Sequence, residues 1–438
     1  MKRISNIIKK FNIFILIVAV LSMASCKSHG QIINYGVEAV IDNESDEVNF
    51  SFEKDIDTRP KSNVETKKDR DYLISENIKN LILNRTRKEK KIKGIYLPAY
   101  VVGSEEKFPG IFENIKKSCI NAIVVDVKDE IGRITFAMDN DFVRSKKTTE
   151  PQIKDIDAFV KLCKENDIYL IARVSSFLDN YLTKLDSSVA LHRNDGKYYR
   201  DNTGYYWLNP YNEDVRKYLI EIGKGCAEAG FDEVQYDYFR FSADSGMRRV
   251  VFTEEETGGK SKIEAITELA QRIYQELIPE NIYVSIDVFG AIMNSYRDQN
   301  SIGQEYVTLL KNIDYLCPMV YPSHYANKTF GIDVPDTKPY DTVKNALETS
   351  TNTINRTLDP LSHYGKVRPW LQGFTANYLE EYIVYDVNEY KEQIKAVEDA
   401  GYDEWMFWHP GGAYKWAAFI DEEKSNEETI AKDLEETK

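Results

Sequence analysis

Metal-binding and nucleic-acid-binding patterns are missing from this 438-residue chain. Its five cysteines include no CxxC pair, and its five histidines show neither HxH nor HExxH spacing, so we expect no metal site and no other cofactor. The net charge of −14 argues against a nucleic-acid partner, because such binding needs a basic surface stripe. Four cysteines lie in apolar periodic segments, which favours buried hydrophobic side chains over disulfides; they are Cys119, Cys163, Cys226 and Cys317.

Long apolar runs are absent except near the N-terminus, where FNIFILIVAVLSMA follows a basic segment. This run has the length of a signal-peptide core and is too short and wrongly flanked for a membrane span. It ends at Met23-Ala24-Ser25-Cys26, which resembles a bacterial lipobox with Met23 in place of the usual leucine. We expect residues 1–26 to be a lipoprotein signal peptide, with Cys26 lipidated so that the exported protein is anchored at a membrane of the cell envelope. The alternative is an ordinary secretory signal with a chance cysteine.

Polar, charged segments flank the body of the chain. Residues 27–91 contain few aromatic side chains and a basic cluster, RTRKEKKIK, so we interpret them as a disordered or weakly helical tether. Residues 421–438 form a short acidic tail. The intervening residues 92–420 are enough for one large domain.

Within residues 92–420, apolar runs alternate with segments of helical spacing. Near-continuous apolar runs are typical of parallel strands buried on both faces. Eight such units fit a closed (β/α)8 TIM barrel better than an open doubly wound sheet, and no GxGxxG follows the first run. The expected strands are 92–100, 121–129, 168–177, 231–241, 281–290, 314–322, 366–374 and 402–410. The expected helices are 108–120, 153–166, 214–230, 263–278, 302–313, 340–355 and 388–401.

The fourth expected strand, FDEVQYDYFRF, delivers Asp237 at its carboxyl end, where barrels of this class build their active sites. Residues i and i+2 share a face, so Gln235 and Asp237 should point to the barrel axis together. The same rule places Asp126 with Lys128, and Trp370 with Gln372. Asp232 and Glu233 open the strand at its other end and are expected to be solvent groups.

Two carboxylates across a cleft ringed by aromatic side chains are the groups that glycoside cleavage needs. The neighbouring strands four and five supply Asp237, as nucleophile or base, and Asp287, as acid or its partner. A nearby cation such as Arg173 would keep one carboxylate ionised while a more buried partner stays protonated. The expected substrate-binding residues are Asp126, Arg173, Arg240, Tyr321, His324, Trp370, Gln372, Trp408 and His409.

Structural roles remain open for each of these residues. A strand-end aspartate can cap the next helix or pair with arginine, Arg173 can simply hold a carboxylate in place, and Lys128 can form an ion pair with Asp126. The aromatic segment GKYYRDNTGYYWLNP (196–210) can be a self-packed lid instead of a set of sugar subsites.

Eight segments carry a resemblance to a known family; they are GIYLPAY, NAIVVDVKDEIG, YLIARVSSFLDN, WLNPYNEDVRKYLIEIGKGCAEAGFDEVQYDYFRF, SIDVFG, MVYPSHY, RPWLQGF and WMFWHPGGAY. Taken in register from Ile92 to Ala418, they resemble a bacterial family of TIM-barrel glycoside hydrolase domains with an alpha-amylase-like assignment and no settled substrate. The resemblance implies a glycosidase fold and a carbohydrate substrate.

Better understood barrels match less well. Chitinase-type enzymes carry DGxDxDxE in strand four, but Gln235 and Phe239 stand here at the middle aspartate and the catalytic glutamate. Amylase-type barrels place an aspartate nucleophile in strand four, which Asp237 matches, and a glutamate acid in strand five, where the shorter Asp287 stands.

The sequence therefore predicts an envelope lipoprotein whose barrel cleaves a polysaccharide or a cell-envelope glycan. A non-catalytic carbohydrate-binding barrel and a different hydrolase on the same fold are the alternatives. If the enzyme hypothesis holds, Asp237 and Asp287 should face one cleft, with carboxyl groups ~5–10 Å apart.

Overall fold

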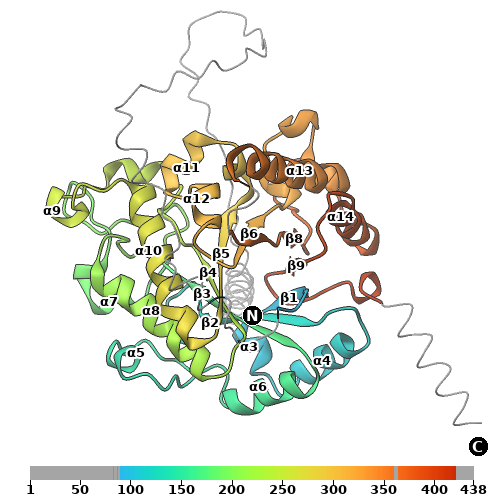
Figure 1. The fold of residues 1–438 in the computed structure, drawn as a ribbon, viewed down its shortest axis with the longest axis horizontal. Coiled ribbons are helices and arrows are strands. Elements are labelled where there is room, and N and C mark those ends of the chain that lie inside the picture. The colour runs from blue at the N-terminus through green and yellow to red at the C-terminus, as the bar shows by residue number, and fades with distance from the viewer. Residues whose placement is uncertain (1–81, 83–85, 87–88, 360–363, 421–438) are drawn as a thin grey trace, which may run out of the picture.

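The computed structural model describes residues 82, 86, 89–359 and 364–420, which fold as a parallel barrel surrounded by helices (Figure 1). In the described residues the strand order is β5-β4-β3-β2-β1-β9-β8-β6-β7, and pairing of β5 with β6 closes the ring. All of these pairings are parallel, as the (β/α)8 prediction requires. The strands are β1 Lys93–Leu97, β2 Ala122–Lys128, β3 Tyr169–Ser175, β4 Glu233–Asp237, β5 Tyr283–Phe289, β6 Tyr315–Met319, β7 Lys366–Val367, β8 Trp370–Gln372 and β9 Trp405–Trp408.

The seventh expected strand is divided into β7 and β8 by Arg368 and Pro369. Proline has no backbone N–H to donate to the ladder, so regular pairing stops there. The carbonyl of Pro369 still accepts from the Met406 amide at 3.0 Å, and the Arg368 amide donates to Leu316 at 3.0 Å. The two short strands therefore fill one place in the barrel.

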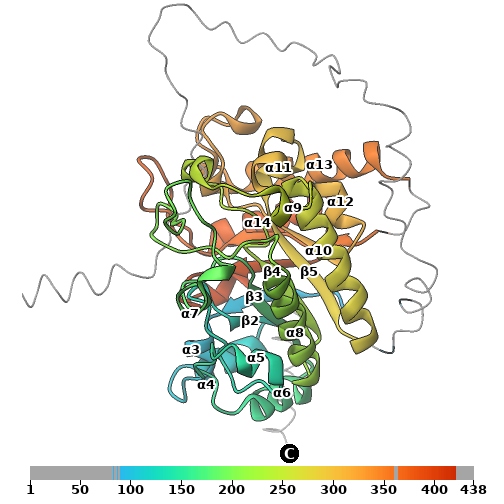
Figure 2. The same cartoon turned by 90° about the vertical axis from the view of Figure 1, so that its left-hand side faces the viewer.

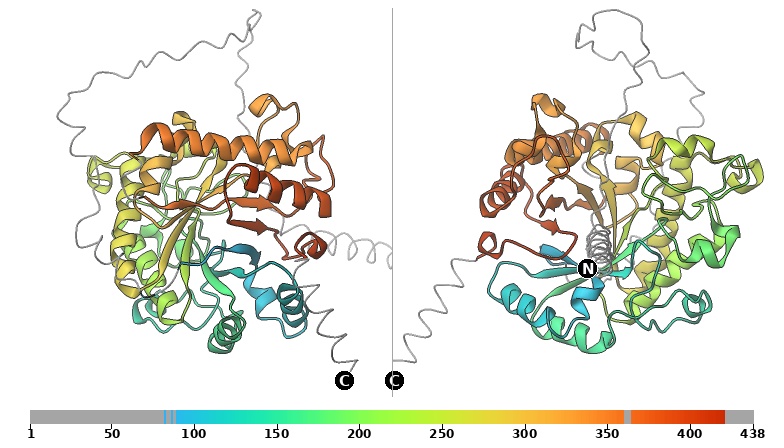
Figure 3. Two further views of the ribbon diagram at one scale, coloured as in Figure 1. Left: turned by 45° about the vertical axis from the view of Figure 1, so that its right-hand side comes forward. Right: turned by 180° about the vertical axis from the view of Figure 1, so that it is seen from behind.

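Helices cover the outside of the strands in all views (Figures 2 and 3). The expected helix at 302–313 is wrong in its bounds, because Gly303, at φ +80°, ends one short helix and another begins at Tyr306. The described helices are α3 Ala99–Val102, α4 Phe108–Lys116, α5 Asp141–Ser145, α6 Ile156–Glu165, α7 Leu182–Leu185, α8 Glu213–Glu228, α9 Glu254–Thr257, α10 Lys262–Leu277, α11 Tyr296–Ile302, α12 Tyr306–Leu310, α13 Pro339–Thr357 and α14 Val387–Asp399.

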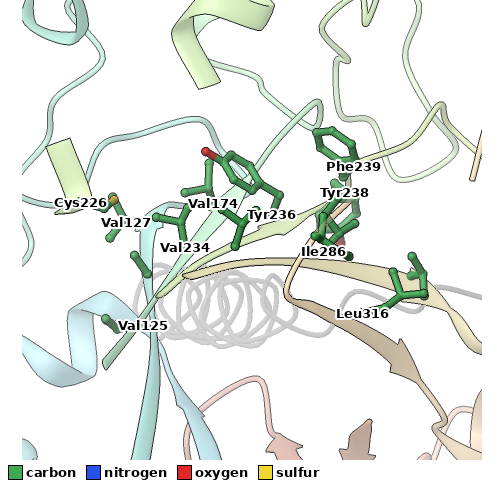
Figure 4. Packing of buried hydrophobic residues seen from close by; sticks show 14 of the residues in the cluster. Val125, Val127, Val174, Cys226, Val234, Tyr236, Tyr238, Phe239, Ile286 and Leu316 are labelled. Atoms are coloured by element: carbon green, nitrogen blue, oxygen red, sulfur yellow. The ribbon is translucent and has the colours of Figure 1, made fainter. Parts of the chain in front are cut away.

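Outward-facing side chains of the strands form the main core with the helices (Figure 4). Val234 and Tyr236 lie in this layer, and the Tyr236 hydroxyl donates to the Leu219 carbonyl of α8 at 3.1 Å. Gln235 points the other way, where its amide contacts the sulfur atoms of Cys317 and Met406 inside the barrel. The predicted alternation along β4 is therefore confirmed.

The barrel interior holds a buried group of ion pairs at the amino-terminal ends of the strands, and this corrects the expectation for Glu233. Glu233 is fully buried and forms a salt bridge to Arg368 at 2.8 Å; Arg368 also contacts Glu404 at 3.2 Å. Period-two geometry places Glu233 on the axial face with Gln235 and Asp237. Our expectation of a solvent group was therefore wrong.

The prediction of buried cysteine side chains is confirmed for Cys163, Cys226 and Cys317, whereas Cys119 is only half-buried. No helix in the described part of the chain has the length and apolar character that crossing a membrane requires. The predicted signal peptide with Cys26, nearly all of the tether and the acidic tail lie outside the described residues.

Candidate active site

Arg173 of β3 is the centre of a group of carboxylates at the carboxyl ends of the strands. Its Nη1 donates to Asp126 Oδ1 at 2.5 Å, and its Nε and Nη2 donate to Asp237 Oδ2 at 3.0 and 2.6 Å. Nη2 also donates to Glu130 Oε1 at 2.7 Å. The Arg173 side chain is only 3 % exposed, so three acidic groups share one buried cation. The negative charges keep the pKa of Arg173 well above its usual value, although burial opposes this.

Asp237 is the last residue of β4, and its backbone fixes the direction of its side chain. Its Oδ1 accepts a hydrogen bond from the Tyr238 amide at 2.6 Å. Tyr238 has a left-handed backbone at φ +48°, a conformation that ends the strand abruptly. The Asp237 side chain is 12 % exposed, so it reaches the mouth of the barrel while it stays paired with Arg173.

Asp287 of β5 lies on the strand next to Asp237. The register of the two strands runs to Tyr236 opposite Ile286, which places the two aspartates side by side one residue further on. Trp370 Nε1 donates to Asp287 Oδ1 at 2.7 Å, and Asp287 is only 2 % exposed. Burial, with the negative charge of Asp237 as a second cause, raises the pKa of Asp287 well above its usual value. Both effects favour the neutral, protonated form of the Asp287 carboxyl group.

Asp126 of β2 binds Arg173 on one side and Tyr96 on the other. The Tyr96 hydroxyl donates to Asp126 Oδ2 at 2.5 Å. Burial raises the pKa of Asp126 to about 7, against the lowering effect of the Arg173 charge. Both oxygens have protein partners, so the geometry gives Asp126 a role in holding Arg173 and Tyr96.

Lys128 does not share a face with Asp126, contrary to the period-two expectation. The register between β2 and β3 shifts between Asp126 and Lys128, so that Lys128 pairs with Val174. This bulge directs Lys128 to a fully buried salt bridge with Asp179 at 2.9 Å. The suggested Lys128–Asp126 ion pair is therefore wrong.

Aromatic side chains form a wall beside the carboxylates. The Trp408 ring stacks between Tyr96 and Tyr321, with centroid distances of 6.2 and 6.1 Å. Phe374 meets Trp408 edge-on at 5.4 Å, and the His324 ring lies 5.0 Å from Tyr321. Burial lowers the pKa of His324 to about 3, so its ring is neutral. This aromatic wall brings together three of the predicted substrate-binding residues: Tyr321, His324 and Trp408.

Gln372 lies inside a hydrogen-bond network of the protein. It is fully buried; its Oε1 accepts from the Ser323 amide at 3.0 Å, and its Nε2 donates to Asp336 Oδ1 at 3.0 Å. The structure therefore assigns Gln372 to the support of the loop after β6. Period-two spacing identified its face but not the neighbours that occupy its amide.

Arg240 and His409 are both engaged by other parts of the protein. The Arg240 guanidinium lies 4.2 Å from the Phe289 ring centroid and donates to the Phe241 carbonyl at 3.0 Å. His409 Nδ1 accepts from the amides of Gly411 and Ala413 at 3.0 and 3.2 Å, which stabilises the turn after β9.

Glu130 is the charged site residue that the sequence analysis missed; the aromatic residues Tyr96 and Phe374 were not predicted either. Glu130 lies outside a strand, in the turn after β2, so neither periodicity nor strand ends pointed to it. The available signal was its place in the segment DVKDEIG, directly after a strand that already supplies Asp126. Among residues 89–359 and 364–420, no group of three or more His, Cys, Asp or Glu side chains is arranged to hold a metal ion. The carboxylates converge on a guanidinium instead.

Comparison with known proteins identifies the barrel. The family model described as "Putative glycosyl hydrolase domain" matches residues 94–414. A hypothetical protein from Ruminiclostridium thermocellum is 34% identical over 44% of this chain and 97% of its own, with a TM-score of 0.41. The PgaB (BpsB) glycoside hydrolase domain from Bordetella bronchiseptica is 9% identical over 74% of this chain and 95% of its own, with a TM-score of 0.53, a likeness of fold alone. No match was found among curated proteins.

Proposed function

The chain belongs to the glycosyl hydrolase family whose model spans residues 94–414, and we propose that its barrel cleaves a polysaccharide or a cell-envelope glycan. The observation that carries this proposal is the pair of neighbouring aspartates in unlike environments. Asp237 is ion-paired with Arg173, whereas the neutral indole of Trp370 donates to the buried Asp287. Carboxyl groups with such different surroundings are suited to opposite roles in one reaction.

In the proposed reaction, Asp237 attacks the anomeric carbon or takes a proton from an attacking water molecule. Asp287 gives its proton to the glycosidic oxygen as the bond to the anomeric carbon breaks. Because Trp370 occupies Oδ1 of Asp287, Oδ2 is the oxygen that carries this proton. Positive charge that develops on the sugar is stabilised by the carboxylate of Asp237.

Substrate contacts come from the aromatic wall defined above. Trp408 is half-buried, and stacked rings of this kind bind the C–H faces of sugars. Asp126 and Arg173 set the position of Asp237. His324, being neutral, suits hydrogen bonding to sugar hydroxyls.

Asp237→Asn tests the proposal, with hydrolysis and binding measured in parallel on an array of glycans. We expect the variant to keep binding and to lose turnover by roughly 10³-fold or more. Asp139→Asn, which changes an exposed aspartate that pairs with Arg144 of α5, is the matched control and should retain activity. Full activity of Asp237→Asn would refute the assignment.

A non-catalytic carbohydrate-binding barrel is the second candidate, favoured by the small exposure of Asp287. It predicts that the wild-type protein binds a glycan that it never cuts. Time courses on every glycan that binds, with product detection by mass spectrometry, distinguish the two.

We also propose that the protein is exported and anchored at the envelope by lipid on Cys26, on the strength of the lipobox-like Met23-Ala24-Ser25-Cys26. Metabolic labelling with a fatty acid should mark the wild-type protein and leave Cys26→Ser unlabelled. Labelling of both would contradict this site of attachment.

A further inference from the structure

Glu130 is held at the mouth of the barrel by a turn that its neighbour Asp129 organises. Asp129 Oδ1 accepts hydrogen bonds from three successive backbone amides, those of residues 131–133, at 2.9 to 3.0 Å. A carboxylate that binds three amides of its own turn fixes the path of the backbone. The direction of the Glu130 side chain is therefore set before any ligand arrives.

The same turn is anchored to the loop after β3. Lys128, just before it, forms the buried salt bridge to Asp179, and the Asn180 amide donates to the Ile131 carbonyl at 2.9 Å. Gly132 has φ +100°, and a Cβ atom there would lie 2.1 Å from Asp179 Oδ1. Only glycine allows this close approach, so the turn cannot shift without breaking the anchor.

Glu130 is the most exposed carboxylate around Arg173. Its side chain is 26 % exposed, against 12 % for Asp237 and 5 % for Asp126. Burial favours the neutral form of Glu130, but the charge of Arg173 and its hydrogen bond outweigh this and lower the pKa. Glu130 is therefore an ionised group that can only accept hydrogen bonds, and among the carboxylates around Arg173 it is the most accessible to a substrate.

The cations beside the site are already engaged. Every nitrogen of the Arg173 guanidinium donates to Asp126, Glu130 or Asp237. Lys128 is paired with Asp179, and Arg240 packs on Phe289. A sugar carboxylate or sulfate could pair with Arg173 only by displacing a protein carboxylate, and it would then stand close to several negative charges.

We infer that Glu130 determines substrate charge: the site accepts a neutral or cationic sugar at the cleaved bond and rejects an anionic one. The Glu130 carboxylate accepts hydrogen bonds from sugar hydroxyl or amino groups and repels acidic substituents. This inference rests on the proposed function and names the substrate class of the same site.

Pairs of iminosugars that share one ring configuration and differ in charge test the inference without knowledge of the natural substrate. Each ring of gluco, galacto and manno configuration is used in two forms, with a hydroxymethyl group or a carboxylate at the carbon outside the ring. Calorimetry on the full-length protein should show binding of at least one hydroxymethyl form, and its carboxylated counterpart should bind about tenfold more weakly or worse. Equal affinity within a pair overturns the inference.

Glu130→Gln keeps the shape of the side chain and removes its charge, so the affinity gap between the two forms should narrow. Glu130→Asp keeps the charge on a shorter side chain and should preserve the gap while it weakens both affinities. Glu150→Gln is the matched control: it removes an exposed carboxylate that pairs with Arg133 nearby, and the gap should stay unchanged.

The results separate the two proposals. If glycans are cut but the gap is absent in the wild type, or survives in Glu130→Gln, the role of Glu130 is refuted and the hydrolase stands. If no iminosugar binds and no glycan is cut, the proposed function fails and this inference fails with it.

Discussion

Replacing Arg173 with methionine should destabilise the protein strongly at neutral and alkaline pH. The change keeps the length of the side chain and leaves Asp126, Glu130 and Asp237 without the cation that they share. Breaking a buried ion pair by removing one partner costs about 3–5 kcal/mol. For a barrel of this size, that loss lowers the midpoint of thermal unfolding by about 5 °C or more.

The stability lost in Arg173→Met should increase as the pH rises. Without Arg173, burial is the largest remaining influence on Asp126 and Glu130, and it raises their pKa values in the folded state above those of the unfolded chain. Groups with raised folded pKa values contribute stability that is fully present below the unfolded pKa of about 4 and is lost as pH rises through the folded pKa. The loss of unfolding free energy caused by Arg173→Met should therefore be smaller at pH 5 than at pH 8. The difference is about 1.4 kcal/mol for each unit by which the folded-state pKa of each carboxyl group is raised.

Urea unfolding followed by tryptophan fluorescence at pH 5 and pH 8 measures this deficit. Arg144→Met is the control, because Arg144 pairs with the exposed Asp139 and Asp141 at the surface and should cost less than about 1 kcal/mol. A deficit that is absent, or the same at both pH values, would refute the view that Arg173 neutralises buried carboxylates.

Three further outcomes follow from the same geometry. Burial raises the pKa of Asp126 to about 7, and protonation of Asp126 breaks its ion pair with Arg173. The value of kcat/KM should therefore fall below about pH 7. Asp126→Asn should abolish this fall on the acidic side of the pH–rate profile. Trp408→Ala should raise KM roughly tenfold with little change in kcat in steady-state kinetics, since its half-buried ring belongs to the aromatic wall and not to the two proposed catalytic carboxyl groups. Arg368→Met should cost about 3 kcal/mol in urea unfolding and leave KM unchanged, because it strands Glu233 at the far end of the barrel.

The local sequence pattern was enough to predict the barrel and the positions of its strands. Each of the first six strands and the last lies within its expected range, and the split seventh does too, because buried parallel strands need uninterrupted apolar runs. Period-two geometry correctly placed Gln235 on the axis and Val234 and Tyr236 under the helices. The strand ends pointed to Asp237 and Asp287 on neighbouring strands, although their catalytic roles stay predictions.

Only the tertiary structure decided which partner each polar residue meets. A bulge between β2 and β3 sends Lys128 to Asp179, and closure of the ring brings Arg368 to Glu233 across 135 residues of chain. Glu130 enters the site from a turn, through a hydrogen bond to an arginine 43 residues away. The sequence by itself determined the side-chain faces of a regular strand such as β4, because side-chain direction there is a local property of the backbone. Pairing of buried charges depends on distance in space, so it was settled only when the barrel closed.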